Sequence, residues 1–212
     1  MTAPGFLAVF SDVDAGHEID YVHWLTREHV KERVSTPGFV GGRVFRALDD
    51  RLRRYLILYD LQSAEVLASD AYLKKLERPS AWSQRTMPRL RRFIRGGGTI
   101  SASAGDGQGA FLAVVEVDDA HRRPARAEVE ALAANDRIAA VRVLVVDTDR
   151  TSIRTHEKSL RSGDASFAAL VLVEATGRDA ARHALEGPPG APSSLEGLAV
   201  TFYAQVFSRA AE

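Results

Sequence analysis

The chain has 212 residues, 45% of them hydrophobic, which is enough for one large domain or two domains of about 100 residues each. Its 28 Lys and Arg residues balance its 28 Asp and Glu residues. This balance argues against a dedicated nucleic-acid-binding protein and against long acidic disordered tails. The absence of Cys excludes disulfides, thiol catalysis and cysteine metal sites.

The hydrophobic segments are too short for a membrane protein. No apolar run approaches the roughly 18 residues needed to cross a bilayer. The N-terminal run 5–10 is too short for a signal peptide and has no basic residues before it. We therefore expect a soluble, cytoplasmic protein that does not bind membranes.

The first half of the chain alternates strand and helix patterns in the order βαββαβ. Helical periodicity predicts two helices, at 18–34 and at 63–76, with Ser63 as the N-cap of the second. The breaker at 36–38 and the turn at 49–51 separate these elements. Extended patterns predict the strands, at 5–12, 39–47, 55–61 and 88–100.

The same order of elements returns in the second half. Gly96-Gly97-Gly98 and the Gly/Ser/Ala-rich stretch 101–109 predict a flexible linker between the halves. Helices are expected at 126–134 and 178–185, and strands at 111–117, 138–147, 167–175 and 198–207. The polar segment 148–166 is expected to be a long hairpin loop, and 188–192 a second loop.

The repeated order predicts an α+β protein made of two tandem ferredoxin-like units, at 1–100 and 108–212. The segments 111–115 and 168–173 are apolar at every position, which is typical of strands buried on both faces. Helices can cover only one face of each sheet. We therefore expect the two sheets to pack together within one chain, as an intrachain dimeric α+β barrel.

Polar residues interrupt the apolar face of the helix predicted at 18–34. Ile19, Val22, Leu25, Val30 and Val34 share one broad face, which should pack on the sheet. The same arc contains four polar residues, which are His23, Thr26, His29 and Arg33. Burying a lone imidazole or guanidinium is costly, so this pattern predicts a helix that lines a cavity.

In that cavity His29 is the candidate acid or base, because imidazole titrates near neutral pH. Arg33, one helical turn away, is the candidate for holding a carboxylate or an enolate. In the alternative interpretation both have a structural role: Arg33 extends to solvent and His29 hydrogen-bonds a carbonyl group.

Tyr21 and Trp24 lie near the opposite face of this helix, among charged residues. Such aromatic side chains predict a cover, which could be the other half, a partner subunit or the 148–166 loop. The alternative is a partly exposed aromatic pair without a special role.

The stretch Trp24-Leu25-Thr26-Arg27-Glu28-His29, followed by Pro37-Gly38-Phe39 and then Arg43 and Arg46, resembles the start of dimeric α+β barrel proteins. It is most similar to the EthD-like group and its uncharacterised relatives. The segments 58–61 and 68–72, with Pro79 and Trp82, resemble the second motif of that group. The resemblance covers residues 5–100, and the second half has none of these motif residues.

The resemblance implies a small-molecule cavity between the sheet and the helices, with His29 as the family's histidine. It makes Arg43, Arg46 and Tyr59 candidate wall residues, together with Trp24 and Thr26 on the helix. Strand alternation means that Arg43 and Arg46 cannot both point inward. Such families include cofactor-free monooxygenases, decarboxylases or cyclases, isomerases, haem-handling enzymes and stress-response proteins.

Other features of the sequence predict little chemistry. His23 and His29 are about 120° apart on the helix, and the remaining histidines are scattered, so we expect no metal site. A buried His could be an axial haem ligand, but no other feature supports haem. The basic run 89–95 is interpreted as a charged edge strand, with anion or nucleic-acid binding as the alternative.

The sequence therefore supports three hypotheses. The first is a cofactor-independent enzyme that acts on a small oxygenated apolar or aromatic molecule by proton transfer, decarboxylation or monooxygenation. The second is a non-catalytic small-molecule-binding or stress-response protein with the same cavity. The third is a structural protein in which His29 is satisfied in the core. A homodimer is compatible with each of them.

Overall fold

The computed structural model describes residues 3–119, 122–161, 164–186 and 193–212. It divides into two compact units. The first contains residues up to Thr99 together with 147–166 and 206–212, and the second contains 100–146 and 167–205. A division at 100–108, as expected from the sequence, would instead assign 147–166 to the second half. The loop predicted at 188–192 lies outside the described residues.

The first unit is built on an antiparallel sheet with the strand order β4-β1-β3-β2. The register places Leu7 opposite Tyr59 and Val9 opposite Ile57, so these four side chains share one face of the sheet. The predicted strands are confirmed with small shifts at their ends. They are β1 (Gly5–Asp12), β2 (Phe39–Ala47), β3 (Arg54–Leu61) and β4 (Arg91–Ala104).

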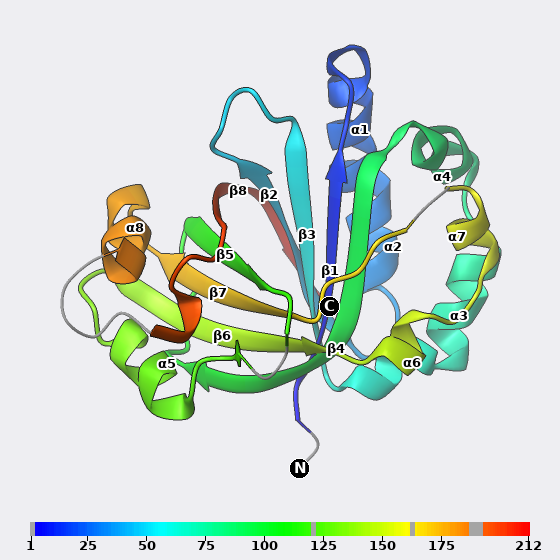
Figure 1. The fold of residues 1–212 in the computed structure, drawn as a ribbon. Coiled ribbons are helices and arrows are strands. Elements are labelled where there is room, and N and C mark those ends of the chain that lie inside the picture. Colours follow the sequence, from blue (N-terminus) through cyan, green and yellow to red (C-terminus); the bar gives the residue numbers. More distant parts are fainter. Residues whose placement is uncertain (1–2, 120–121, 162–163, 187–192) are drawn as a thin grey trace. The chain divides into compact units, whose positions relative to one another are not determined.

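One face of this sheet packs against a helix that runs from Glu18 to Val34, as predicted. It consists of α1 (Glu18–Trp24), a π-helical turn (Leu25–His29) and α2 (Val30–Val34). Figure 1 shows α1 and α2 running along the sheet. Short 3-10 turns lie at Ala15–His17, before α1, and at Met87–Arg89, before β4.

The prediction of a second helix at 63–76 is wrong for the first half of that range. A 3-10 turn occupies Ala64–Ala68, and α3 (Asp70–Glu77) begins only after it. Ser69, not Ser63, caps α3, because its Oγ accepts a hydrogen bond from the backbone N–H of Tyr72. A further helix, α4 (Ala81–Thr86), follows it, capped by Ser80.

The linker predicted around Gly96–Gly98 is wrong, because these residues belong to β4 and pair with Phe6–Ala8 of β1. Only 105–109 of the predicted linker lie outside the strand. Gly97 is required by close packing: a Cβ there would lie 2.6 Å from Leu67 Cδ1 and 3.1 Å from the Phe6 carbonyl oxygen. The glycines therefore reflect the close approach of neighbouring groups and not flexibility.

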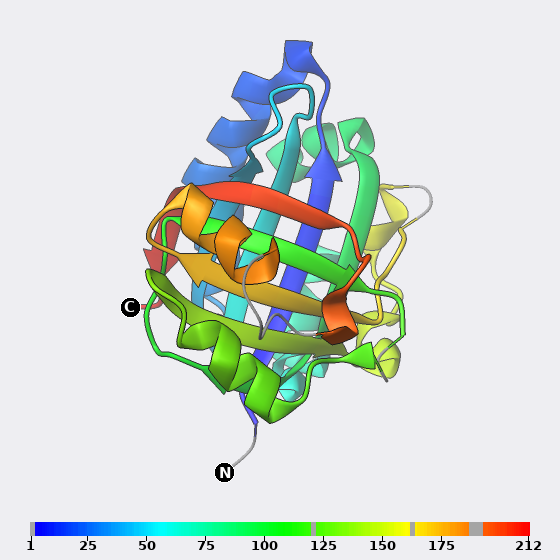
Figure 2. The same ribbon diagram turned by 60° about the vertical axis from the view of Figure 1, so that its left-hand side comes forward.

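The segment 148–166 is not the hairpin loop that its polarity predicts. It contains two short helices, α6 (Thr148–Thr151) and α7 (His156–Ser159). Figures 1 and 2 show both helices beside β4 and α3, within the first unit. This placement brings polar side chains of the segment next to the helix that carries His29.

The second unit repeats the order βαββαβ. Its antiparallel sheet has the order β8-β5-β7-β6, and Figure 2 shows α5 and α8 on one face of it. The predicted elements are confirmed, and β7 is buried at every position. Their bounds are β5 (Phe111–Val117), α5 (Arg126–Ala133), β6 (Ile138–Val146), β7 (Ala169–Ala175), α8 (Arg178–Glu186) and β8 (Val200–Ala210), with a 3-10 turn at Ser193–Leu195.

Among the described residues, no helix is long and apolar enough to cross a membrane.

Candidate active site

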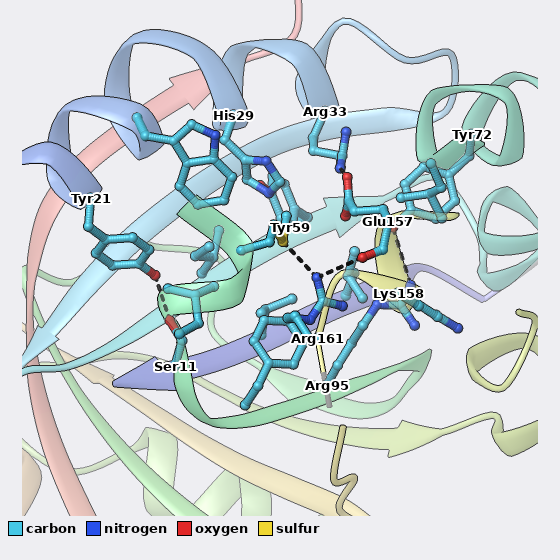
Figure 3. A pocket seen from close by; sticks show the side chains of 18 residues that line it. Ser11, Tyr21, His29, Arg33, Tyr59, Tyr72, Arg95, Glu157, Lys158 and Arg161 are labelled. Carbon is cyan, nitrogen blue, oxygen red and sulfur yellow. Dashed lines mark hydrogen bonds and ion pairs between the residues drawn. The ribbon is translucent and has the colours of Figure 1, made fainter. Parts of the chain in front are cut away.

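A cavity opens inside the first unit, between the sheet and the helices around it. Its walls come from the Glu18–Val34 helix, from β1, β3 and β4, from α3, and from residues 157–161 (Figure 3). About 30 Å³ is open to water-sized molecules, which is room for about two waters.

The π-helical turn presents His29 to this cavity. It places an extra residue in the helix, and such single π turns are frequent at functional sites. His29 is 6% exposed, and its ring lies against the ring of Trp24, with 4.2 Å between the centroids. Trp24 is itself fixed by a hydrogen bond of 3.1 Å from Nε1 to Ser83 Oγ. Trp24 therefore supports one side of the imidazole.

The π turn also explains an error in the predicted helix faces. Tyr21 and Trp24, predicted to point outward, are each only 1% exposed, whereas Ile19, predicted to face the sheet, is 75% exposed. The prediction applied one period of 3.6 residues per turn to the whole of 18–34. The extra residue of the π turn rotates α1 relative to α2 about the helix axis. The buried face of α1 therefore differs from the face expected by continuing the pattern of Val30 and Val34 towards the N-terminus.

His29 is electrostatically unusual. Burial, followed by the positive charges of Arg33 and Arg161, holds its pKa well below its ordinary value. The imidazole is therefore neutral at pH 7. Its Nδ1 is buried without a hydrogen-bond partner among the described residues. A neutral buried imidazole with a free ring nitrogen can accept a proton from a bound molecule or form a hydrogen bond with it.

Arg33 lies one turn beyond His29 and is 2% exposed. Its Nη2 donates to Glu157 Oε2, and its Nη1 lies 3.3 Å from Glu32 Oε2. Glu157 belongs to α7, so the segment 147–161 supplies the carboxylate that balances the buried guanidinium. This ion pair fixes the position of Arg33 beside the imidazole.

Tyr59 comes from β3, on the sheet face that the helix covers. Burial raises its pKa well above the ordinary value, so the phenol keeps its proton. Its hydroxyl is buried without a hydrogen-bond partner among the described residues. Three buried polar atoms of the cavity lining therefore make no hydrogen bond within the described part of the chain: Tyr59 Oη, His29 Nδ1 and Arg33 Nη1. Arg33 Nη1 still lies 3.3 Å from a carboxylate oxygen of Glu32, whereas Tyr59 Oη and His29 Nδ1 have no such neighbour, which is costly unless a ligand contacts them.

Three further cations line the cavity, and the sequence did not predict them. Arg161 lies over the ring of Phe93, 3.9 Å from its centroid, and pairs with Asp164 at 3.0 Å. Arg95, at the end of the basic run, is 7% exposed and donates to Tyr72 Oη at 3.2 Å. Lys158, from α7, is the third, and burial together with Arg95 lowers its pKa to about 8.

Four predicted site residues meet at this cavity: Trp24, His29, Arg33 and Tyr59. Thr26, Arg43 and Arg46 are not part of its lining. Thr26 hydrogen-bonds the Val22 carbonyl oxygen of its own helix at 2.8 Å. Arg46 pairs with Glu18, with 3.3 Å between Arg46 Nε and Glu18 Oε1.

Arg43 is buried on the opposite face of the sheet, where it lies 5.4 Å from the centroid of the Phe45 ring. The expectation that Arg43 and Arg46 point to opposite faces is confirmed.

The residues that sequence reasoning missed are Arg95, Glu157, Lys158 and Arg161. The basic run 89–95 was interpreted as a charged edge strand, yet Arg95 points into the unit, and its backbone N–H donates to the Ala165 carbonyl oxygen at 2.9 Å. The other three lie in the segment interpreted as a loop. Their mixed charges, Glu157-Lys158 and then Arg161, were the one available signal of a buried polar contact.

Among the described residues, no group of three or more His, Cys, Asp or Glu side chains could hold a metal ion. Among the described residues that line the cavity, His29 is the one histidine, and the Trp24 ring covers one face of its imidazole.

Neither a protein-family model nor a curated protein sequence matches the chain. Solved structures do match it. An anthrone oxidase-like protein aligns with a TM-score of 0.63 at 12% identity, covering 100% of this chain and 94% of its own. A protein from Fusobacterium nucleatum, named provisionally as a monooxygenase, aligns with a TM-score of 0.59 at 9% identity, covering 99% and 95%.

A third protein, named provisionally as a chlorite dismutase, aligns with a TM-score of 0.52 at 10% identity, covering 98% and 96%. At such low identity the likeness concerns the fold and not the activity. The chain thus shares with these structures the α+β fold class that its order of elements predicted.

Proposed function

We propose that this protein is a cofactor-independent enzyme that removes a proton from a small, weakly acidic, oxygenated molecule in the cavity of the first unit. The observation that carries the proposal is the pair of unsatisfied polar atoms, His29 Nδ1 and Tyr59 Oη, buried in one cavity. One is a proton acceptor and the other a proton donor. Deprotonation next to a carbonyl group requires both.

In this mechanism His29 Nδ1 takes the proton from a carbon or hydroxyl group of the substrate. The negative charge that develops on the substrate oxygen accepts a hydrogen bond from the Tyr59 hydroxyl. Arg33 lies one turn away, and its positive charge lowers the pKa of His29. The anion that forms on the substrate opposes this effect, because its negative charge attracts the imidazolium that forms in the same step.

Monooxygenation is the extension that the names of the structural neighbours favour. A deprotonated substrate can transfer electrons to O₂ without a cofactor. A methylene group and O₂ then give a carbonyl group and water: one oxygen atom stays on carbon, and the other leaves with the two hydrogens. The sequence begins with the proton transfer assigned to His29.

The test uses a panel of small carbon acids, such as anthrone, cyclic 1,3-diketones and lactones. Deuterium exchange at the acidic carbon is followed by NMR, and O₂ uptake with an electrode. We expect the wild type to accelerate exchange, and His29→Gln to lose the acceleration by about 100-fold or more. Tyr59→Phe should lose less. His23→Gln, on the same helix but outside the cavity, is the matched control.

A panel compound that binds but shows neither exchange nor oxidation, in every variant, would favour the second hypothesis, a non-catalytic small-molecule-binding protein. The specific support for that hypothesis is the small volume of the cavity. Native mass spectrometry of the purified protein should come first, since it reports a retained ligand and the subunit number together.

We also propose that the two units are a tandem duplication of an EthD-like unit, because both have the order βαββαβ.

A further inference from the structure

Two cations next to the candidate active site, Arg95 and Lys158, form no ion pair with any described residue. Arg95 is 93% buried and donates to the Thr151 carbonyl oxygen and to Tyr72 Oη, each at 3.2 Å. Lys158 Nζ donates to the carbonyl oxygens of Thr151 and Ile153. One neutral carbonyl group, that of Thr151, therefore accepts hydrogen bonds from both cations.

The other cations of the cavity have their charge balanced. Arg33 pairs with Glu157, and Arg161 pairs with Asp164. Within the described part of the chain, no carboxylate lies within 4.0 Å of the charged nitrogens of Arg95 or Lys158. A buried cation without an anion is costly, and the cost rises when like charges are close together. This arrangement favours binding of an anion from outside the chain.

The position of the two side chains suggests where that anion lies. Arg95 and Lys158 line the cavity that contains His29, and they also line a second cavity of about 260 Å³. Both cavities belong to the first unit. Thr148, Thr151 and Ser152 contribute to the wall of the second one. Figure 3 shows the side chains of Arg95, Lys158 and Arg161 on the side of the His29 cavity away from the helix that carries His29.

We propose that Arg95 and Lys158 bind a carboxylate of a small organic ligand, which extends from the second cavity towards His29. The inference deepens the proposed function, since it names the charge of the substrate at the same site. Two cations match the two oxygens of one carboxylate. Asp164 also lines the second cavity, where it pairs with Arg161 and leaves Arg95 and Lys158 as the cations that face the ligand.

The electrostatics of Lys158 agree with an anion-binding site. Burial and then Arg95 lower its pKa to about 8, and Arg161 lowers it further, although Asp164 and Glu157 oppose the shift. A bound carboxylate would oppose both positive neighbours and raise the pKa of the amine. It would also reduce the positive field on His29, which makes the imidazole a stronger base when the ligand is bound.

The test is equilibrium binding, measured by NMR titration or calorimetry with acetate and benzoate against the neutral acetamide and benzamide. We expect the wild type to bind each carboxylate more tightly than its amide, by about tenfold or more. Lys158→Met and Arg95→Met should remove this preference, whereas Lys158→Arg, which keeps the charge, should retain most of it. Lys74→Met, at an exposed position of α3, is the control.

Equal binding of carboxylates and amides by the wild type, or no binding of either at millimolar concentration, would overturn the proposal. So would an unchanged preference in folded Lys158→Met. Should Arg95→Met fail to fold, the comparison of Lys158→Met with Lys158→Arg still shows whether the carboxylate preference depends on the positive charge at this position. His29→Gln separates this inference from the proposed function, since it should bind benzoate normally while it loses proton transfer.

Discussion

The two units have the same order of elements but different interiors. The buried cluster of the second unit contains Ala, Val and Leu side chains throughout. That of the first includes aromatic side chains, with Tyr21, Trp24, Tyr59 and Tyr72 around the cavity, and it adjoins buried His29 and Arg33. The order of strands and helices sets the scaffold, and the polar residues on the first long helix decide whether a site exists.

Buried charge is also handled differently in the two units. In the second, Glu174 is fully buried, but it lies 3.4 Å from Arg142 and accepts a hydrogen bond from the backbone N–H of Gly109. In the first, Arg33 and Glu157 pair, whereas the hydrogen bonds that Arg95 and Lys158 donate to described side chains and carbonyl groups all end on neutral oxygens. The first unit thus keeps unbalanced charge where a ligand can use it.

The largest effect should come from breaking the buried pair between Arg33 and Glu157. Glu157→Ala leaves the guanidinium buried without its main counter-charge, which should lower the free energy of unfolding by about 3–5 kcal/mol. Urea unfolding followed by circular dichroism measures it. Glu130→Gln, in the exposed pair with Arg126 on α5, should show no measurable loss. Equal losses in the two variants would mean that α7 is not held by this contact.

An exchange of residue types between the two interiors should have effects of opposite sign. Val129 is fully buried in α5, and Val129→His places an imidazole in an aliphatic core, which should cost about 2–4 kcal/mol. His29→Leu should instead raise the free energy of unfolding by about 1 kcal/mol while activity is lost. The comparison fails if His29→Leu destabilises as much as Val129→His.

A smaller effect should distinguish a packed strand from a linker at Gly97. Gly97→Ala brings a Cβ within 2.6 Å of Leu67, which should cost about 1–3 kcal/mol. Gly16→Ala, where nothing lies within 4 Å of the added Cβ, is the matched control and should be nearly neutral. Thermal unfolding is sufficient to compare them. A neutral Gly97→Ala would agree with the flexible linker that composition predicted.

The sequence predicted the fold better than it predicted the site. Strands such as Gly5–Asp12 and Phe39–Ala47 were located correctly because their apolar runs are flanked by clear breakers. His29 and Arg33 were found because they interrupt an apolar helical face. Each of these signals is local and can be read within one turn or one strand.

The rest of the site depends on contacts between distant parts of the chain. Glu157 reaches Arg33 across 124 residues, and no local pattern in 148–166 predicts that contact. The π turn at Leu25–His29 has no sequence signature that a 3.6-residue period would detect, so the inward positions of Tyr21 and Trp24 were missed. Arg95 was missed because a run of arginines is usually exposed, as Arg91 and Arg92 are.

The smallest expected effect is the pH dependence that His29 gives the first unit. Its folded-state pKa is lowered by burial, whereas the unfolded chain should titrate near the usual value of about 6.5. As the pH falls below about 6.5, His29 binds a proton in the unfolded chain but stays neutral in the folded protein. The stability contributed by neutral His29 is therefore present above this pH and is lost below it, by up to about 1.4 kcal/mol per pH unit.

Urea unfolding of the wild type and of His29→Gln, at a series of pH values from above to below the ordinary pKa of histidine, isolates this contribution from that of the carboxylates. The difference between the two proteins should be constant at the higher values and should then shrink or change sign as the solution becomes more acidic. His183→Gln, at an exposed position of α8 in the second unit, should follow the wild type throughout. Parallel curves for the wild type and His29→Gln would mean that His29 takes up its proton at the same pH in the folded and unfolded chains. That result would contradict an imidazole kept neutral by burial, and the difference between the two interiors would be one of packing alone.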